Sequence, residues 1–233
     1  MLVIFGTRFY GEIDSYGGQR QLTKFFHIYY LPLMPVDTLW VTRDLEEGVS
    51  GHPVKMSGRS LLAGYTRVWG PVAAIGAFLA GNVSVMAIAG ALAAVSVWTW
   101  SWRAVRSARE QRRSDFHLLA FGTRCDPLKM DDQLAATLQS HVSERWAEVA
   151  DGNSPEDIAR LGAATPVQAV LAYASLRFAA RLAPGDDARR SLDASERILD
   201  AVKDRPALDD GPYRSPTPPP LPASASGGDP AGR

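Results

Sequence analysis

Residues 68–102 read VWGPVAAIGAFLAGNVSVMAIAGALAAVSVWTWSW, and this stretch between Arg67 and Arg103 carries no formal charge. A helix rises about 1.5 Å per residue and the hydrocarbon layer of a bilayer is about 30 Å thick, so roughly 20 apolar residues make one pass. The stretch is too long for one pass, and Gly81-Asn82 near its middle favours a tight turn. The sequence therefore predicts a transmembrane helical hairpin, with helices at about 60–80 and 83–102.

Aromatic and basic residues flank this hairpin. We expect four tryptophans to be interfacial anchors: Trp69, Trp98, Trp100 and Trp102. Arg67 lies in the opening turns of the first helix, where its long side chain would reach the headgroups. Both ends of the hairpin are basic and its turn is uncharged, so the positive-inside rule places both termini in the cytoplasm. We therefore expect a multi-pass protein of the bacterial inner membrane. Two other structures fit the same stretch: a buried hairpin of a soluble protein, and a re-entrant hairpin that does not cross.

Composition gives few further clues to function. The 233 residues hold 25 Lys and Arg against 25 Asp and Glu, so no global charge points to nucleic acid or an acidic substrate. One cysteine, Cys125, excludes an intramolecular disulfide framework and a multi-cysteine zinc site. The apolar run at residues 1–5 is too short for the apolar region of a signal peptide, so we expect the hairpin itself to direct insertion.

Residues 1–59 have the pattern of a small β domain, with four or five short strands in a sheet or open barrel. Apolar and alternating runs are broken by glycines, and Tyr16-Gly17-Gly18-Gln19 is a turn signal. Pro32 and Pro35 interrupt a long aromatic run and mark a strand end, a bulge or an edge. Seven apolar side chains would form the core or face the bilayer: Phe25, Phe26, Ile28, Tyr30, Leu31, Leu33 and Leu39.

FGTRFYGEID at residues 5–14, followed by TKFFHIYYLPLMPVDTLWV at residues 23–41, resembles a known pattern. It is similar to the N-terminal domain of uncharacterised bacterial membrane proteins with a G-T-x-x-Y-G element and an F-F-H-x-x-Y-L-P-L-x-P element ahead of transmembrane helices. Similar segments occur in zinc-ribbon-headed membrane proteins, where C-x-x-C pairs bracket the strand. Those cysteines are absent here, so the resemblance implies a cysteine-free relative, a fold and no activity.

No residue has a spacing that predicts catalysis, a cofactor or a metal site, and we assign none. His27 in the aromatic run could be a ligand, a proton-responsive group or a lipid contact, but a hydrogen-bonded histidine of a small sheet explains it more simply. The other histidines have no i, i+4 partner. Cys125 could be a nucleophile only if the fold supplied a base, so we interpret it as a small apolar residue.

Residues 103–130 are predicted to form a basic extension of the second helix and a connector. Four arginines recur at three- and four-residue steps, and one helix face would present them to anionic lipid headgroups: Arg103, Arg106, Arg109 and Arg113. The same patch could contact nucleic acid only if it were free of lipid, so we expect no nucleic-acid partner.

Residues 131–203 predict a C-terminal module of three or four amphipathic helices, a small bundle that weakly resembles tetratricopeptide-type pairs. Ser154-Pro155 and Thr165-Pro166 each place a capping hydroxyl before a proline at the first helical position. Residues 204–233 are rich in Pro, Ser, Gly and Ala, and we expect a disordered tail whose prolines could dock in an aromatic groove.

The predicted whole is an α+β membrane protein, and the function expected of it is an adaptor or scaffold. It would hold partner proteins at the cytoplasmic face of the inner membrane through residues 131–203. The same pattern is compatible with a homo-oligomer of this chain. One alternative is a membrane-associated enzyme of unknown reaction that uses His27, Asp37, Arg43 or Cys125. The other is a subunit of an oligomeric membrane complex or transporter, although the apolar helices offer no intramembrane charge beyond Arg67.

Overall fold

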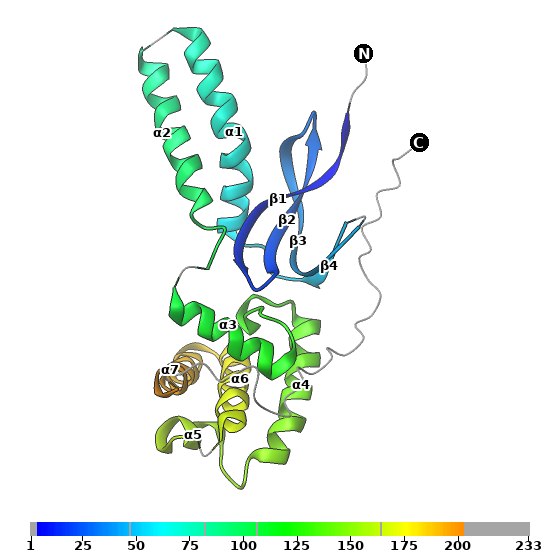
Figure 1. Cartoon of the computed structure of the whole chain (residues 1–233), viewed down its shortest axis with the longest axis vertical. Helices are drawn as coiled ribbons and strands as arrows, with labels where there is room; N and C mark the ends of the chain where they lie inside the picture. Colours follow the sequence, from blue (N-terminus) through cyan, green and yellow to red (C-terminus); the bar gives the residue numbers. More distant parts are fainter. Residues whose placement is uncertain (1–3, 47, 82, 106, 164, 203–233) are drawn as a thin grey trace. The chain divides into compact units, whose positions relative to one another are not determined.

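The computed structural model describes residues 4–46, 48–81, 83–105, 107–163 and 165–202 (Figure 1). They divide into two compact units, with the boundary between residues 105 and 106. The N-terminal unit combines an antiparallel sheet with two long helices, and the C-terminal unit is helical. The described residues therefore form an α+β protein. The predicted disordered tail, 204–233, lies outside the described residues.

The sheet of the N-terminal unit is a four-stranded antiparallel meander. Its strands lie in chain order, β1 (Phe5–Tyr16), β2 (Gln19–Ile28), β3 (Leu31–Leu45) and β4 (Gly48–Pro53). The predicted first turn is confirmed, because Gly17 and Gly18 have φ of 56° and 78°, values that suit a tight hairpin. The first three strands are longer than expected.

Two register shifts in the sheet explain how β3 holds two prolines. Pro35 pairs with Phe25 and Pro32 with His27, and the register between β2 and β3 slips next to each pair. A proline has no amide hydrogen to donate to a ladder, so it belongs at such an irregularity. Of the three predictions for these prolines, a strand end, a bulge or an edge, the register shifts favour a bulge or a similar irregularity.

Helix α1 (Gly58–Ala80) lies on the sheet through its N-terminal half. Ser60, Ala63 and Gly64 are buried there. The Ser60 hydroxyl donates to the Gly11 carbonyl at 2.7 Å, and a Cβ on Gly64 would lie 2.8 Å from the Phe25 ring. Small residues at these positions let the helix backbone approach the strands closely, so helix and sheet form one unit rather than separate domains.

Helix α2 (Val83–Trp100) runs back along α1 (Figure 1). The predicted turn begins at Gly81, which ends α1 in the left-handed conformation with φ 64°; Asn82 lies outside the described residues. Close packing occurs at Gly70, where a Cβ would lie 2.8 Å from the Ser96 Cβ. Of the described helices, α2 alone is long and apolar enough to cross a membrane. The expectation of two such helices is therefore not met, because α1 is long enough but its N-terminal half carries polar residues such as Arg59, Thr66 and Arg67.

The predicted continuation of the second helix through residues 103–115 is wrong. Helix α2 ends at Trp100, the chain turns, and Ser107 precedes a separate helix, α3 (Ala108–Phe121). The backbone at this turn joins β1 instead: Ser15 donates to the Arg103 carbonyl at 2.6 Å and Val105 donates to the Ser15 carbonyl at 3.2 Å.

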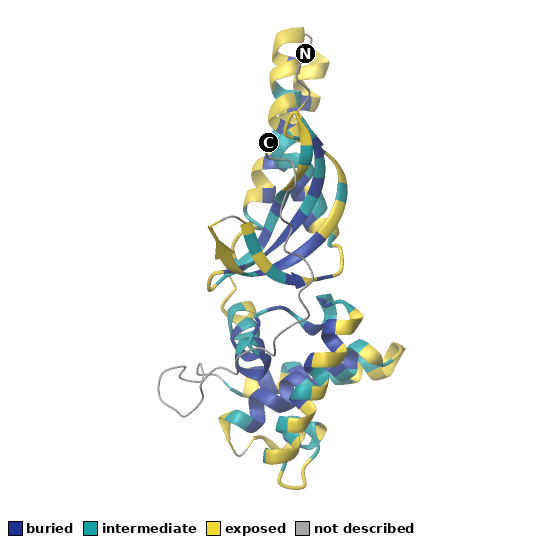
Figure 2. Cartoon of the chain, turned by 90° about the vertical axis from the view of Figure 1, so that its right-hand side faces the viewer, coloured by how far each residue is buried: buried dark blue, intermediate teal, exposed yellow. Residues whose placement is uncertain are grey.

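The C-terminal unit is a bundle around one central helix, α6 (Pro166–Leu182). Four helices and a short 3-10 turn pack on it or on its neighbours: α3, the turn Pro127–Lys129, α4 (Asp132–Val149), α5 (Pro155–Leu161) and α7 (Gly185–Ala201). Aromatic rings fill the interior, with Tyr173 and Phe116 at 5.3 Å and Phe121 and Phe178 at 5.5 Å between centroids. Buried residues concentrate on α6 and the faces that surround it (Figure 2).

The predicted helix starts of this unit are confirmed. The Ser154 hydroxyl accepts from the Asp157 amide at 3.1 Å, and the Asp157 side chain accepts in return from the Ser154 amide at 3.2 Å. Thr165 caps α6 by accepting from the Gln168 amide at 3.2 Å. The Gln168 side chain does not complete a second box but donates to the Val149 carbonyl at 2.7 Å, which ties α6 to the end of α4.

Candidate membrane interface

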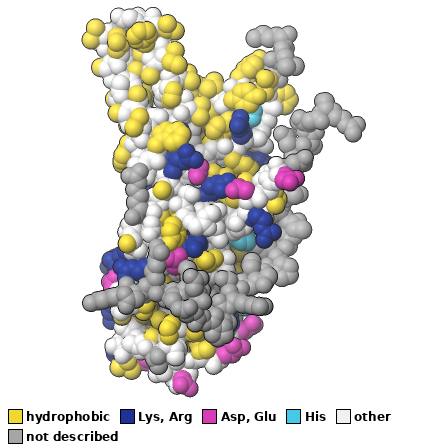
Figure 3. Space-filling model, viewed as in Figure 1, with side chains coloured by type: hydrophobic (Ala, Val, Ile, Leu, Met, Phe, Trp, Pro, Cys, Tyr) yellow, Lys and Arg dark blue, Asp and Glu magenta, His cyan; other side chains and the backbone are white. Residues whose placement is uncertain are grey.

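The part of the helix pair beyond Gly70 presents apolar side chains outward on all sides. The most exposed of them are Ile75, Phe78, Leu79, Val83, Ile88 and Val97, each more than 60% accessible. Figure 3 shows this end of the N-terminal unit as an almost uncharged apolar surface. Only 17% of the apolar window of α2 is buried, whereas the core helix of a soluble protein would be mostly buried. Contact with water over such a surface is unfavourable, and continuous apolar patches of this kind mark interaction sites.

Charged and aromatic residues border this apolar surface where it meets the sheet. We call this group, Arg67, Glu12, Arg103 and Trp100, the base of the helix pair. Arg67 donates to the Glu12 carbonyl at 2.7 Å and to the Thr99 carbonyl. Arg103 pairs with the Glu12 carboxylate at 2.5 Å, and both guanidinium groups lie over the Trp100 ring, at 5.3 and 5.1 Å from its centroid. Arg67 therefore does not depend on headgroups for partners, because the protein supplies backbone carbonyls.

The four predicted anchors lie around this base, at one end of the helix pair. Trp98 and Trp100 are exposed near the end of α2, and Trp102 stacks edge-on against Trp98 with centroids 4.8 Å apart. Trp69 lies on α1 and donates to the Pro32 carbonyl at 3.0 Å. An interfacial role for these tryptophans remains a prediction. They are spread along this end of the helix pair, because the Trp100 ring lies against Arg67 and the Trp102 ring lies against Arg59, eight residues earlier in α1.

The four arginines predicted to line one helix face are not on one helix. Arg103 belongs to the base of the helix pair, and Arg106 lies outside the described residues. Arg109 and Arg113 lie in the N-terminal half of α3, where they pair with acidic residues of α7: Arg109 with Asp200 at 2.9 Å and Arg113 with Glu196 at 2.7 Å. These two cations therefore stabilise the C-terminal unit, whether or not they also contact lipid.

The residues of the enzyme alternative do not form a site within either unit. On the sheet, His27 is buried and stacks on Tyr30 at 5.5 Å, whereas Arg43 lies at the far end of β3, where it pairs with Ser50. Asp37 accepts from the Thr38 amide at 2.7 Å. Cys125 lies in the helical unit, fully buried, and burial raises the pKa of its thiol far above the ordinary value. A thiol in this environment stays protonated and unreactive.

The C-terminal unit contains a buried cluster of charged side chains that the sequence did not predict. Arg177 of α6 pairs with Asp126, and its second nitrogen lies 3.6 Å from Glu196. Burial would raise the pKa of Asp126, but the Arg177 charge and smaller contributions from its surroundings hold it below the usual value. Burial lowers the pKa of the neighbouring His117 to about 3, so this imidazole is neutral. The only signal in the sequence was an arginine within the apolar stripe of α6, one turn after Tyr173.

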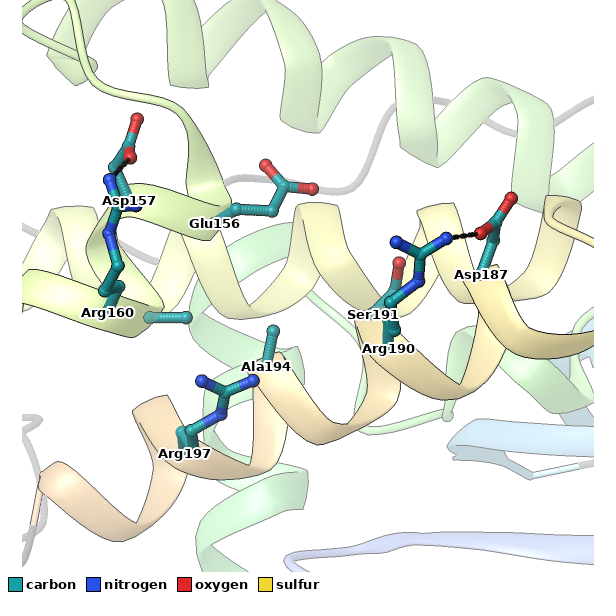
Figure 4. A pocket seen from close by; sticks show the side chains of 9 residues that line it. Glu156, Asp157, Arg160, Asp187, Arg190, Ser191, Ala194 and Arg197 are labelled. Atoms are coloured by element: carbon teal, nitrogen blue, oxygen red, sulfur yellow. Dashed lines mark hydrogen bonds and ion pairs between the residues drawn. The ribbon is translucent and has the colours of Figure 1, made fainter.

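A shallow groove of about 470 Å³ lies between α5 and α7 (Figure 4). Three arginines and three carboxylates line most of it: Arg160, Arg190, Arg197, Glu156, Asp157 and Asp187. Arg160 pairs with Asp157 at 2.6 Å and Arg190 pairs with Asp187, so the lining is charged but locally balanced. Such an open polar surface suits contact with another polar surface. Among the described residues, no group of three His, Cys, Asp or Glu side chains is arranged to hold a metal ion.

Comparison with known proteins adds no relative, because no family model, curated protein or solved structure matches the chain.

Proposed function

We propose that the protein is a membrane-anchored adaptor, which holds protein partners at the cytoplasmic face of the bacterial inner membrane. The observation that carries this proposal is the apolar surface of α1 and α2 beyond the charged base of Arg67, Glu12 and Arg103. A bilayer covers such a surface on all sides, and the base lies where hydrocarbon would give way to headgroups.

The helix pair is short for a complete crossing. From Val68 to Ala80, α1 reaches about 20 Å beyond its base, and α2 from Val83 to Trp98 reaches about 24 Å. The hydrocarbon layer is about 30 Å thick, so the pair falls roughly 6 to 10 Å short. Thinning the bilayer costs fractions of a kcal/mol per Å, or a few kcal/mol here.

A hairpin that stopped inside the hydrocarbon would cost more. Its tip would leave up to about eight backbone groups, the last carbonyls of α1 and the first amides of α2, without partners. Each unsatisfied group in hydrocarbon costs several kcal/mol. Thinning is therefore the cheaper solution, and we propose that the tip at Gly81 reaches the far headgroups through a locally thin bilayer.

The adaptor role rests on the helical unit. A hairpin returns the chain to the side on which it began, so the sheet and the helical unit share one compartment, and the basic flanks make that compartment the cytoplasm. The charged groove between α5 and α7 supplies a surface with paired but accessible arginines and carboxylates. A partner with complementary charges would exchange these local pairs for intermolecular ones, as in polar protein interfaces.

Single cysteines test the topology. Native Cys125 is fully buried and a poor reporter, so it is replaced by serine. Leu161→Cys reports on the helical unit, where Leu161 is 73% exposed, and Val83→Cys reports on the tip, where Val83 is 81% exposed. With a membrane-impermeant maleimide, we expect Val83→Cys to react in spheroplasts and Leu161→Cys to react only after lysis. Reaction of Leu161→Cys in intact spheroplasts would contradict the cytoplasmic placement.

Charge reversal in the groove tests the adaptor role. Arg190→Glu with Arg197→Glu changes two lining residues, whereas Arg189→Glu changes an exposed arginine of the same helix that does not line the groove. We expect proteins cross-linked to the wild type in cells to be lost from the double variant and kept by Arg189→Glu. Identical cross-linked partners in all three would count against the groove as the contact.

A further inference from the structure

We infer that the turn between β2 and β3 is a second membrane contact, a β-hairpin tip that lies in the interface of an anionic bilayer beside Trp69. This inference rests on the proposed membrane anchor and adds to it the orientation of the sheet and the class of lipid.

Apolar side chains are exposed at one end of the sheet. The exposed residues on and around the turn are Phe5, Tyr29, Tyr30, Leu33, Met34 and Val36, with Phe5 and Met34 more than 60% accessible. Phe5 of β1 joins this group because it pairs with Ile28 at the end of β2. The turn points the same way as the free end of the helix pair (Figure 1), and Figure 3 shows apolar surface at both.

The turn residues themselves are unusual. Tyr29 and Tyr30 have φ of 48° and 64°, the left-handed region that hairpin turns normally fill with Asn and Gly. Two aromatic residues in this conformation cost strain, and such strain is kept where it serves a function. A tyrosine has an apolar ring and a polar hydroxyl, which suits it to the boundary between hydrocarbon and water.

Three hydrogen bonds fix the height of this turn. Trp69 donates to the Pro32 carbonyl at 3.0 Å, and the Tyr65 hydroxyl donates to the Leu33 carbonyl at 2.7 Å. On the sheet, the Tyr10 hydroxyl donates to the Tyr30 carbonyl at 2.8 Å. The turn is therefore attached to α1 next to Trp69, one of the predicted interfacial anchors. A bilayer that surrounds α1 beyond Trp69 would also contact the turn.

A cation next to the tip points to anionic lipid as its occupant. The Arg8 guanidinium lies 5.7 Å from the centroid of the Tyr30 ring at the turn. The Lys24 ammonium lies farther down the strands, 6.0 Å from the centroid of the Phe9 ring, and Lys24 pairs with Asp37 across β2 and β3. Both cations come from strands that lead to the tip. Basic residues behind an apolar tip attract anionic headgroups.

Site-specific fluorescence tests the inference on the full chain. With Cys125→Ser as background, an environment-sensitive probe is attached at one of three exposed positions: Met34→Cys at the turn, Leu45→Cys at the other end of the same strand, and Ile88→Cys in α2. The protein is reconstituted in vesicles of phosphatidylcholine and phosphatidylglycerol, with and without nitroxide-labelled lipid.

We expect nitroxide lipid to quench the probes at positions 34 and 88 and to spare the probe at position 45. Quenching at 88 alone would overturn the β-hairpin contact and leave the anchor intact. Quenching at none of the three would overturn both. Quenching at 45 as well would mean that the sheet lies flat on the bilayer, which contradicts contact through the tip. Loss of the signal at 34 in vesicles without phosphatidylglycerol would support selection of anionic lipid, and an unchanged signal would overturn it.

Discussion

At the scale of single residues, Gly11 sets how closely α1 lies on the sheet. Its φ is 67°, and an added Cβ would lie 2.1 Å from the Ser60 carbonyl oxygen. We expect Gly11→Ala to destabilise the N-terminal unit by about 3 kcal/mol or more, since backbone strain and overpacking add. Gly18→Ala is the matched control: its φ is 78°, but nothing lies within 4 Å, so it should cost only about 1 kcal/mol. Equal losses in thermal unfolding would contradict the close approach.

His117 should make the helical unit sensitive to acid. Its pKa is about 3 in the folded protein and about 6.5 in an unfolded chain, so the unfolded state binds a proton first as the pH falls. Stability is then full above pH 6.5 and declines by roughly 1.4 kcal/mol per unit below it. His117→Phe keeps a ring beside Phe121 and should flatten this decline. The measurement is hydrogen exchange of α6, corrected for intrinsic rates; an unchanged slope in the variant would refute the role of His117.

Features that depend on a few neighbouring residues, such as helix caps and tight turns, could largely be predicted from the sequence. The caps at Ser154 and Thr165 and the turn at Gly17-Gly18 each depend on a few neighbouring residues, and they are confirmed. The pairing of Arg177 with Asp126 joins residues far apart in the chain. No local pattern reports such a contact, so it could not be predicted.

At the scale of elements, Gly70 determines the spacing of α1 and α2. A Cβ there would lie 2.8 Å from the Ser96 Cβ and 3.4 Å from the Leu92 carbonyl, so Gly70→Leu must push the helices apart. We expect it to lower the free energy of unfolding in detergent by about 1 to 3 kcal/mol. Gly76→Leu adds the same side chain to the same helix where nothing lies within 4 Å, and it should change little. A similar loss of unfolding free energy in both variants would show that the effect comes from intrinsic helix propensity and not from packing between α1 and α2.

The helices also show where element prediction reaches its limit. Helix length and apolar content placed α1 and α2 within about two residues, because both properties are local. They did not reveal that Ser60 and Gly64 pack on strands, since small residues are equally expected between membrane helices. Likewise, Arg109 and Arg113 have the spacing of a lipid-facing helix, yet their partners lie on α7.

At the scale of the whole molecule, the proposed anchor depends on one contact: a bilayer would cover the exposed apolar surface of α1 and α2. The sequence predicted this surface, and the structure adds that the sheet and the charged base bound it on one side. The partners of the helical unit could not be predicted, because a charged groove such as that between α5 and α7 has no sequence motif.

The most direct test is alkaline carbonate extraction of membranes that contain the wild type, Ile88→Leu or Ile88→Arg. Ile88 is 64% exposed near the middle of α2, and arginine at the centre of a membrane helix costs about 3 kcal/mol relative to isoleucine. We predict that the wild type and Ile88→Leu stay in the pellet, and that Ile88→Arg moves toward the supernatant or is degraded. Release of the wild type by carbonate, with Ile88→Arg equally abundant and soluble, would contradict the proposed contact with a bilayer.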